Sequence, residues 1–514
     1  MTAATAATGA APSMARAALW AILLVGILLR LNAVLLPFDH RLPNAWRQSD
    51  YFSIARNFDR EGMNILYPRI DWRRDTPGYA EMEFPIVPWL GAALYRVAGP
   101  HVQLLRGLTA GFEIAALLLF ARLAWVLLPP AGALFALLAF AVNPLLIVLS
   151  GSIQPEPLLN VCTLLCVTLL WRWRQQPSVL LLIGTAACAA AAILVKLPAA
   201  YLGLVMAYVI VRTLGVHAVW RPSIIAAALV ALLPPAAWYT WAHGFWLTYG
   251  NSLGLSNESH WIGRDILFPP TFLVGIATWE TVGVFTPAGV LLALAAIRLP
   301  WSRIELPLVW LAAVAVFYVA AGRTTGDRWA YYYHSLSVAP GALLMGAGFW
   351  TLRERLAIPA AWRVVGRWQR VIGGVLGVAT VVSLVTFAGW LVHLREYGHA
   401  DYEVMRRCLL QFAPLVPPDG RIVVRGGSMV DERGHPVAYN ESMAFAWMDR
   451  RGFNYGQEEL SVTTLDAIAA RGGRYWVASR SDLADKHFAA EIEARYPRLA
   501  SCDDNFALYD LRPQ

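Results

Sequence analysis

The sequence predicts an all-α polytopic membrane protein that carries a small C-terminal α/β domain. Of its 514 residues, 58% are hydrophobic and 15% are charged, whereas about 25% of the residues in a typical soluble domain are charged. The charge is unevenly spread, since residues 394–514 hold 33 acidic and basic residues and the much longer segment 1–393 holds 43. We therefore expect a transmembrane domain over 1–393 and a soluble domain over 394–514.

About eleven apolar segments are long enough to span a bilayer. They are 17–37, 103–128, 131–150, 156–173, 178–196, 198–214, 223–243, 281–298, 304–322, 334–351 and 371–393. With the N-terminus in the cytoplasm, the cytoplasmic ends carry thirteen arginines and only two acids, Glu305 and Glu354. This asymmetry follows the positive-inside rule, so the net charge of +8 does not indicate a nucleic-acid partner. The odd number of segments places residues 394–514 outside the cytoplasm.

The C-terminal segment has the pattern of a small α/β domain. Short stretches rich in Val, Ile, Tyr and Trp predict strands over 421–425, 474–479 and 506–511, and helical periodicity predicts helices over 441–451 and 481–496. Cys408 and Cys502 lie in this domain. They can form a disulfide if the domain is extracytoplasmic, and the sequence leaves both states open.

The first outer loop, residues 38–102, contains eight acids between Asp39 and Glu83. Long ordered loops tend to be functional. Asp50 directly precedes apolar residues that share one helical face, namely Tyr51, Ile54, Ala55 and Phe58. We expect a short amphipathic helix on the membrane surface with Asp50 in its first turn. There Asp50 is either a helix cap or an ionised catalytic carboxylate.

Two further acids lie where helices are expected to begin. Glu83 is followed by a Pro-x-x-Pro stretch and a predicted interfacial helix over 84–98, so it is either a functional acid or a solvated loop end. Glu156 begins a spanning helix at the outer face, where an acid is also favourable for the helix dipole alone. Glu113 differs, because it falls inside an apolar segment and is either functional or paired with Arg106 or Arg30.

Several basic residues are expected at the outer face, where they could bind a phosphate group. Lys196, one of two lysines beside 40 arginines, ends a helix, where it can bind phosphate as a point charge or extend toward water. Residues 323–334 interleave Arg323, Arg328 and His334 with aromatic side chains. This pattern suits a lipid-linked phosphate, and an aromatic membrane belt is the alternative.

The order of these elements resembles the GT-C superfamily of membrane glycosyltransferases, in the group of protein O-mannosyltransferases and lipid A aminoarabinose transferases. The motifs support the resemblance over residues 17–200, and hydropathy supports it over 200–393. The resemblance implies that Asp50 is the catalytic aspartate of the first loop, that Glu83 and Glu156 are the second and third acids, and that Lys196 matches a Lys-x-Pro position. A basic residue of the family is missing after Glu83, where Phe84 and Pro85 stand.

The resemblance implies transfer of a sugar, with inversion, from a polyprenyl-phosphate donor to an extracytoplasmic glycolipid, cell-wall glycan or protein. Asp50 would act as general base, Glu83 and Glu156 would orient hydroxyl groups, and the donor phosphate would meet Lys196 and the basic residues of 323–334, which are Arg323, Arg328 and His334. We expect no metal cofactor, because the acids are spread along the chain, although a divalent ion between Asp50 and Glu83 stays open.

We expect this activity at a bacterial inner membrane.

Three other classes of function are compatible with the composition. A lipid or sugar transporter would need internal repeats and charges at the bilayer midplane. A non-catalytic scaffold would tolerate replacement of the three acids, and a polymerase or ligase of lipid-linked glycans would differ in its acceptor.

Overall fold

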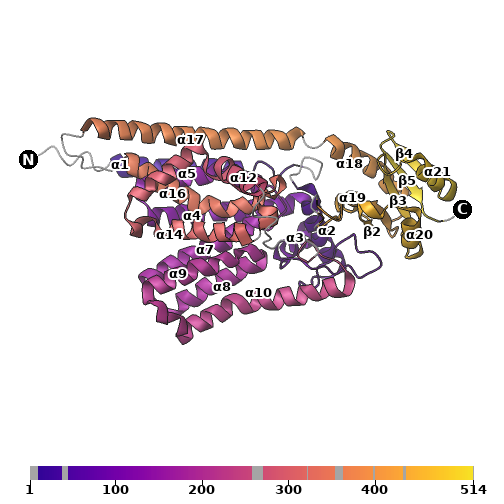
Figure 1. Ribbon diagram of the computed structural model, residues 1–514, viewed down its shortest axis with the longest axis horizontal. Helices are drawn as coiled ribbons and strands as arrows, with labels where there is room; N and C mark the ends of the chain where they lie inside the picture. Colours follow the sequence, from indigo (N-terminus) through magenta and orange to yellow (C-terminus); the bar gives the residue numbers. More distant parts are fainter. Residues whose placement is uncertain are drawn as a thin grey trace, which may run out of the picture. The chain divides into compact units, whose positions relative to one another are not determined.

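The computed structural model describes residues 10–36, 44–256, 270–320, 322–353, 363–397, 400–431, 434 and 436–512 (Figure 1). The chain divides into two compact units. Unit 1 comprises Met1–Leu35, Arg106–Pro235 and His260–His393, and unit 2 comprises Leu36–Leu105, Ala236–Ser259 and Leu394–Gln514. The first loop and the C-terminal region, far apart in the sequence, therefore belong to the same unit.

The described part of unit 1 is helical. Its elements are α1 (Ala10–Arg30), α4 (Val102–Leu127), α5 (Pro130–Ala141), α6 (Pro144–Ser150), α7 (Glu156–Gln175), α8 (Val179–Val195), η1 (Leu197–Tyr201), α9 (Leu202–Leu214), η2 (Val216–Trp220), α10 (Pro222–Tyr249), α12 (Pro270–Thr278), η3 (Trp279–Phe285), α13 (Pro287–Ala295), η4 (Ala296–Arg298), α14 (Trp301–Ala320), α15 (Gly322–Thr325), η5 (Arg328–His334), α16 (Ser335–Arg353) and α17 (Arg363–Tyr397). Helices α4, α10 and α17 cross the boundaries of the units.

Each of the eleven apolar segments contains a helix among its described residues, which confirms the predicted fold class. Six helices among the described residues are long and apolar enough to cross a membrane: Val102–Leu127, Leu197–Leu214, Pro222–Tyr249, Trp301–Ala320, Ala330–Arg353 and Arg367–His393. Two bent pairs, α5 with α6 (51°) and Pro270–Phe285 with Pro287–Arg298 (80°), bring the number to eight. The three segments outside this set correspond to α1, α7 and α8, of which α8 has only 17 residues.

Prolines and polar caps determine where several of these helices begin. Pro144 and Pro287 stand in the first helical positions of α6 and α13, where a missing N–H group costs nothing. The Asn143 side chain accepts a hydrogen bond from the first turn of α6, and the Ser178 side chain does so for α8. The local sequence therefore indicates the bends at Pro144 and Pro287.

Helix α16 forms the centre of unit 1, since nearly its whole length is buried against α5, α13 and α14. Glycines permit the closest approach. A Cβ atom on Gly346 of α16 would lie 2.4 Å from the carbonyl oxygen of Gly132 in α5. Any larger side chain at this position would push the two helices apart, as is typical of small residues between membrane helices.

Unit 2 joins two helices of the first loop to a C-terminal α/β region. The first-loop helices are α2 (Ala45–Glu61) and α3 (Ile86–Ala98). The C-terminal elements are α18 (Ala400–Phe412), η7 (Ala413–Leu415), β1 (Ile422–Arg425), α19 (Met443–Met448), β2 (Gly452–Tyr455), η8 (Gln457–Glu459), α20 (Val462–Ala470), β3 (Tyr475–Ser479), α21 (Lys486–Arg495), β4 (Arg498–Cys502) and β5 (Phe506–Asp510). The sheet has the order β2-β1-β3-β5-β4, with β2, β1 and β3 parallel and β5 antiparallel to both of its neighbours.

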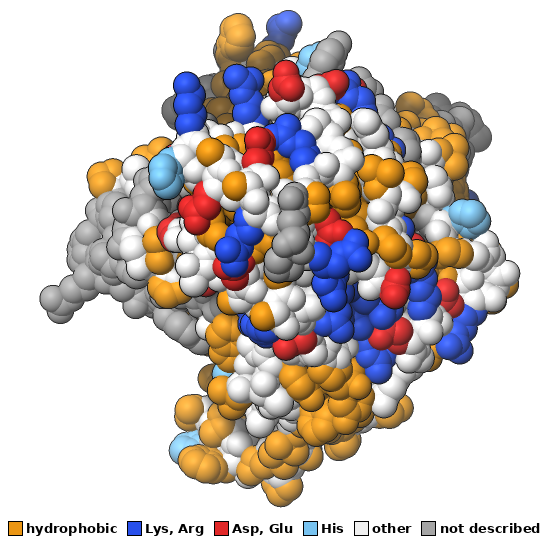
Figure 2. All heavy atoms as spheres, turned by 90° about the vertical axis from the view of Figure 1, so that its right-hand side faces the viewer, with side chains coloured by type: hydrophobic (Ala, Val, Ile, Leu, Met, Phe, Trp, Pro, Cys, Tyr) orange, Lys and Arg blue, Asp and Glu red, His pale blue; other side chains and the backbone are white. Residues whose placement is uncertain are grey.

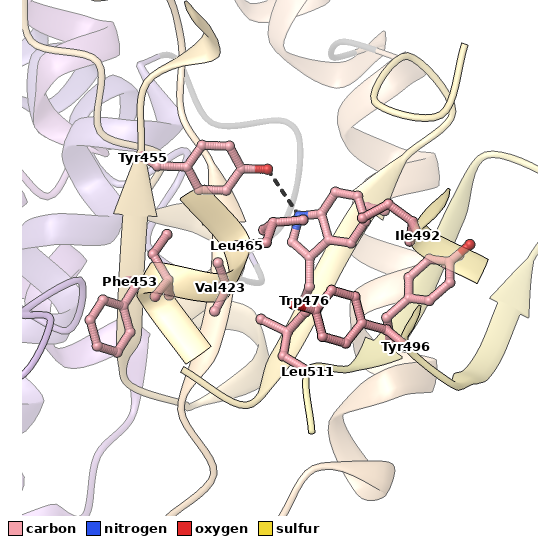
Figure 3. Close-up of a cluster of buried hydrophobic side chains, with 12 residues drawn as sticks. Val423, Phe453, Tyr455, Leu465, Trp476, Ile492, Tyr496 and Leu511 are labelled. Carbon is pink, nitrogen blue, oxygen red and sulfur yellow. Dashed lines mark hydrogen bonds between the residues drawn. The ribbon is translucent and has the colours of Figure 1, made fainter. Parts of the chain in front are cut away.

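One buried cluster holds the C-terminal sheet to its helices (Figure 3). It includes Val423 of β1, Phe453 of β2, Trp476 of β3 and Tyr509 of β5. The indole nitrogen of Trp476 donates a hydrogen bond of 2.9 Å to Tyr455 Oη (Figure 3). This bond satisfies the polar atom of a ring that is otherwise surrounded by apolar groups.

The three predicted strands and two predicted helices of this region are present as β1, β3, β5, α19 and α21. The sequence analysis missed α18, α20, β2 and β4; β2 and β4 are the two edge strands of the sheet. Cys408 of α18 and Cys502 of β4 form a disulfide with a Cα–Cα distance of 5.5 Å. The structure thus resolves the alternative that the sequence left open.

Charged side chains of both signs mix on the face that Figure 2 shows. In unit 2, exposed ion pairs link the first loop to the C-terminal region. Arg60 contacts Asp449 at 2.7 Å, and Arg451 contacts Glu61 at 2.7 Å. Exposed pairs of this kind contribute about 0–1 kcal/mol each, so they align the two segments more than they stabilise them.

Candidate active site

Asp50 lies inside α2 and not at its beginning. The helix begins at Ala45, so Asp50 is its sixth residue, and the first turn contains no acid. The prediction that Asp50 lies in the first turn, and with it the cap alternative, is therefore wrong. The polar stretch before Asp50 lacks apolar periodicity, but it is helical because α3 and α19 pack on α2.

The second prediction for this helix also needs correction. An amphipathic surface helix would leave its polar side chains in water, but most polar side chains of α2 are buried. They are Arg47, Gln48, Ser49, Asp50, Ser53, Arg56 and Asn57. Helix α2 is therefore an internal element of unit 2, and its polar groups are held by protein partners.

The Asp50 carboxyl group is 2% exposed. Trp72 Nε1 donates a hydrogen bond of 2.8 Å to Asp50 Oδ1. Burial raises the pKa of Asp50 to about 7, the Trp72 hydrogen bond opposes this shift, and the negative charges of Glu441 and Asp71 add to it. A carboxyl group with a pKa near neutrality is suited to take a proton at physiological pH.

Asp71 anchors the loop that carries Trp72. Its carboxylate accepts hydrogen bonds of 2.8 Å from Arg56 Nη2 and from Asn57 Nδ2, both on α2. Arg73, on the other side of Trp72, contacts Glu61 near the end of the same helix at 2.9 Å. The indole that binds Asp50 is thus fixed on both sides to the helix that carries Asp50.

Glu83 lies three residues before the start of α3 at Ile86, because the helix begins two residues later than the sequence predicted. It accepts hydrogen bonds of 3.3 Å from Arg47 Nη2 and from Tyr51 Oη of α2. Since Arg47 lies one turn before Asp50 and Tyr51 follows it, the structure brings Glu83 to the part of α2 that carries Asp50. Tyr51 and Arg47 hold the carboxylate as a hydrogen-bond acceptor.

In unit 1, the structure pairs Glu156 with Lys196. Glu156 begins α7, as predicted, and Lys196 lies between α8 and η1. Their side chains form an ion pair and are 1% and 3% exposed. Lys196 Nζ also lies 4.1 Å from the ring centre of Tyr332 and 4.5 Å from that of Tyr333, both in η5. The alternative in which Lys196 extends toward water is therefore wrong.

His334 ends η5 and is fully buried. Its Nδ1 atom lies 2.7 Å from Glu280 Oε1, and its Nε2 atom lies 2.9 Å from the carbonyl oxygen of Thr325. Both ring nitrogens therefore have protein partners. The side chains of Arg323 and Arg328 lie outside the described residues.

Glu113 is paired with Arg30, one of the two partners that the sequence suggested. Arg30 Nε lies 3.8 Å from Glu113 Oε2, whereas Arg106 donates to the carbonyl oxygen of Ala33. Asn160 Nδ2 donates a hydrogen bond of 2.6 Å to Glu113 Oε1. Because Asn160 lies one turn after the start of α7, this network fixes the end of the helix where Glu156 stands.

Sequence reasoning missed several residues of both sites. Trp72, Asp71 and Glu441 act on Asp50, and Glu280 binds His334. Trp72 and Asp71 stand in the acid-rich first loop, so the density of acids and aromatic residues was a signal for them. Nothing local marks Glu441, which follows Asp50 by 391 positions.

No known protein-family model and no curated protein matches the sequence. Several solved structures resemble the fold, including the following three. ArnT from Cupriavidus metallidurans bound to undecaprenyl phosphate has a TM-score of 0.62 and 16% identity, over 96% of this chain and 97% of that chain. The Archaeoglobus fulgidus oligosaccharyltransferase tethered with an acceptor peptide has a TM-score of 0.55 and 13% identity, over 96% of this chain and 74% of that chain.

The third structure is the arabinofuranosyltransferase AftD from Mycobacteria, with a TM-score of 0.51 and 14% identity over 96% of this chain and 40% of that chain. All three are GT-C glycosyltransferases. Likeness at this level of identity concerns the architecture, and it extends over nearly the full length of this chain. The protein therefore has the GT-C fold, as the order of its sequence motifs predicted.

Proposed function

We propose that this protein is a membrane glycosyltransferase that moves a sugar from a polyprenyl-phosphate donor to an acceptor hydroxyl group outside the cytoplasm, with inversion. The observation that carries the proposal is the likeness to ArnT bound to undecaprenyl phosphate, which covers 96% of this chain and 97% of that one. The acceptor is a glycolipid, a cell-wall glycan or a protein.

Asp50 is the general base of the proposed reaction. Its pKa of about 7 lets it take the proton of the acceptor hydroxyl as the new glycosidic bond forms. The bond between the anomeric carbon and the phosphate oxygen breaks on the opposite face, which inverts the configuration. Glu83, held by Arg47 and Tyr51, accepts hydrogen bonds from acceptor or sugar hydroxyl groups.

Lys196 stabilises the leaving polyprenyl phosphate. A phosphate leaves as an anion, so it needs positive charge more than it needs a proton. Glu156 and the rings of Tyr332 and Tyr333 hold the ammonium group in place until the donor arrives. Arg323 and Arg328 complete the proposed phosphate site, whereas both ring nitrogens of His334 are held by Glu280 and Thr325. No step is assigned to a metal ion.

The proposed location is the plasma membrane of a bacterium, with the N-terminus in the cytoplasm and unit 2 outside. The arginine-rich ends of the predicted cytoplasmic loops support this orientation. The Cys408–Cys502 disulfide supports an oxidising compartment for the C-terminal region. The first loop belongs to the same compact unit as the C-terminal region, which supports an extracytoplasmic position for the loop as well.

The proposal is tested by sugar transfer in nanodiscs. Purified wild type, Asp50→Asn and Asp59→Asn are incubated with a panel of labelled polyprenyl-phosphate sugars and total membrane extract as acceptor source. Asp59→Asn is the matched control, because it makes the same change on α2 at a side chain that is partly exposed. We expect a labelled product with wild type and the control and at least a hundred-fold less with Asp50→Asn.

Two results would contradict the proposal. Equal transfer by Asp50→Asn and wild type would remove Asp50 as the base while leaving a transferase. Absence of any product with every donor, from a wild-type protein that unfolds cooperatively, would contradict the transferase itself and call for a lipid-transport assay. Treating the wild type with a chelator in the same assay tests whether a divalent ion contributes.

A further inference from the structure

Residues 79–84, the part of the first loop that carries Glu83, pack against the last turns of α10 and the residues that follow it. We call these residues, 238–256, the α10 end segment, and both segments belong to unit 2. The Glu81 N–H group donates a hydrogen bond of 3.0 Å to the Asn251 carbonyl, and the Leu253 N–H group donates one of 2.9 Å to the Glu81 carbonyl. The backbone at Glu81 is thus bonded in both directions to the α10 end segment.

Trp238 of the α10 end segment holds the two neighbours of Glu83. Its indole nitrogen donates a hydrogen bond of 3.1 Å to the Met82 carbonyl. Its ring meets the Phe84 ring edge-on, with 5.1 Å between the ring centres. Trp238 and Met82 are both buried. Because Met82 and Phe84 flank Glu83, these contacts fix the backbone that carries the Glu83 side chain.

The Glu81 carboxylate is buried, and the α10 end segment supplies three donors to it. Ser252 Oγ donates to Glu81 Oε2 at 2.7 Å, and Ser256 Oγ donates to Glu81 Oε1 at 2.8 Å. His243 Nδ1 lies 3.0 Å from Glu81 Oε1, and the imidazole donates because a carboxylate can only accept. Burial of a carboxylate is unfavourable without such donors, so this contact set resists separation of the two segments.

The two acids of the loop segment consequently differ in what they can do. Glu81 is 4% exposed, and both of its oxygens accept hydrogen bonds from the α10 end segment. Glu83 is 13% exposed, and its contacts with Arg47 and Tyr51 of α2 are both 3.3 Å long. Glu81 therefore anchors the loop segment, whereas Glu83 can accept a further hydrogen bond from a substrate hydroxyl group.

His243 differs from the other donors in its exposure, since 47% of its side chain is in contact with solvent. Its Nδ1 atom nevertheless meets the buried Glu81 carboxylate. Neutral imidazole with the proton on Nδ1 donates there, and protonated imidazole does so as well. The contact with Glu81 is therefore retained in both charge states, and anchoring of Glu81 by His243 does not require a proton to move.

We propose that His243 is a positioning residue of the transfer reaction, which through Nδ1 anchors Glu81 and so holds Glu83 where it meets the substrate hydroxyl group. The effect on transfer rests on the proposed function, whereas the anchoring of residues 79–84 does not. Helix α10 is long and apolar enough to cross a membrane. His243 thus connects a membrane helix to the loop that carries a candidate site acid.

The experiment uses replacements that separate the two ring nitrogens. In His243→Asn the amide nitrogen stands close to the place of Nδ1, in His243→Gln it stands close to the place of Nε2, and His243→Leu removes both donors. His101→Leu is the matched control, because it makes the same change at an exposed histidine of unit 2. Backbone amide hydrogen exchange is measured for each protein in nanodiscs, and no substrate is needed.

We expect the Glu81 and Leu253 amides to exchange about ten-fold faster in His243→Leu and His243→Gln, because loss of one hydrogen bond to a buried charge eases local opening. Exchange in His243→Asn and His101→Leu should stay close to that of wild type. Equal exchange in His243→Leu and wild type would overturn the inference. If His243→Leu does not fold, Ser256→Ala removes another donor to the same oxygen, and unchanged exchange in that variant would overturn it as well.

Transfer kinetics then show whether His243 acts through Glu83. The value of kcat/KM should fall roughly ten-fold in His243→Leu, and His243→Asn should restore it while His243→Gln should not. In a Glu83→Gln background, His243→Leu should cause little further loss, because the side chain that it positions is already replaced. Losses that multiply fully, or recovery with glutamine and not with asparagine, would overturn the positioning role.

The two measurements separate failure of this inference from failure of the proposed function. Undiminished transfer by His243→Leu in spite of faster exchange would overturn the positioning role and leave the transferase in place. Absence of transfer by the wild type would contradict the proposed function, and the exchange rates of the Glu81 and Leu253 amides would then decide by themselves whether His243 anchors the loop.

Discussion

Replacement of Asp50 by asparagine should make the protein more stable at high pH, although it removes the proposed base. In the folded protein burial raises the pKa of Asp50 from 3.8 to about 7. Between about pH 4 and pH 7, Asp50 keeps its proton in the folded state but has lost it in the unfolded state. The contribution of protonated Asp50 to the free energy of unfolding is therefore fully present below about pH 4 and is lost as the pH rises through about 7.

The size of the effect follows from the shift. Three pH units correspond to about 4 kcal/mol in the free energy of unfolding, of which about 2 kcal/mol falls between pH 5.5 and pH 8. Asparagine does not titrate, and its side-chain oxygen can still accept the Trp72 hydrogen bond. The stability of Asp50→Asn relative to wild type should therefore rise by about 2 kcal/mol over this interval.

The assay is thermal unfolding of wild type, Asp50→Asn and Asp59→Asn in detergent at a series of pH values. The melting temperature of Asp50→Asn minus that of wild type should increase steadily from pH 5.5 to pH 8. Asp59→Asn should follow the wild type. Parallel curves for wild type and Asp50→Asn would refute the reasoning, because Asp50 would then already be ionised in the folded protein at pH 5.5.

Three further predictions concern the partners of these residues. Lys196→Met should lower the stability by about 3–5 kcal/mol, because it leaves Glu156 charged and buried, and adding Glu156→Gln should restore most of the loss in a thermal melt; no recovery would argue against the ion pair. Trp72→Phe removes the hydrogen bond to ionised Asp50, so the acidic limb of the pH profile of transfer should move up by about one pH unit, and an unmoved limb would contradict this role. Replacing both disulfide cysteines by serine opens a loop of 94 residues and should lower the free energy of unfolding by up to about 4 kcal/mol, whereas equal melting of both forms would show that the bond contributes little.

The features that the sequence predicted correctly depend on short stretches of chain. Hydropathy located the apolar helices, and the polar composition after residue 393 located the C-terminal sheet. Glu156 begins α7 and Lys196 directly follows α8, as the local pattern indicated. Each of these features follows from the composition and periodicity of neighbouring residues, which are present in the sequence itself.

The incorrect prediction for Asp50 has the opposite origin. The stretch before Asp50 is polar and lacks apolar periodicity, so the sequence placed the start of the helix too late. In the structure α3 and α19 pack on α2, and twelve of its 17 residues are buried, most of its polar side chains among them. Tertiary packing here outweighs the local pattern, which is why the cap interpretation was wrong.

The sequence by itself therefore determined the membrane composition, the helical class and the polar C-terminal region. It also identified the acids and the lysine that are candidate site residues. Only the tertiary structure decided their partners. Lys196 meets Glu156 across 40 positions, Trp72 meets Asp50 across 22, and Glu441 acts on Asp50 across 391. Such pairings arise when distant elements bury their polar side chains together, and a buried polar group must find a partner wherever the fold supplies one.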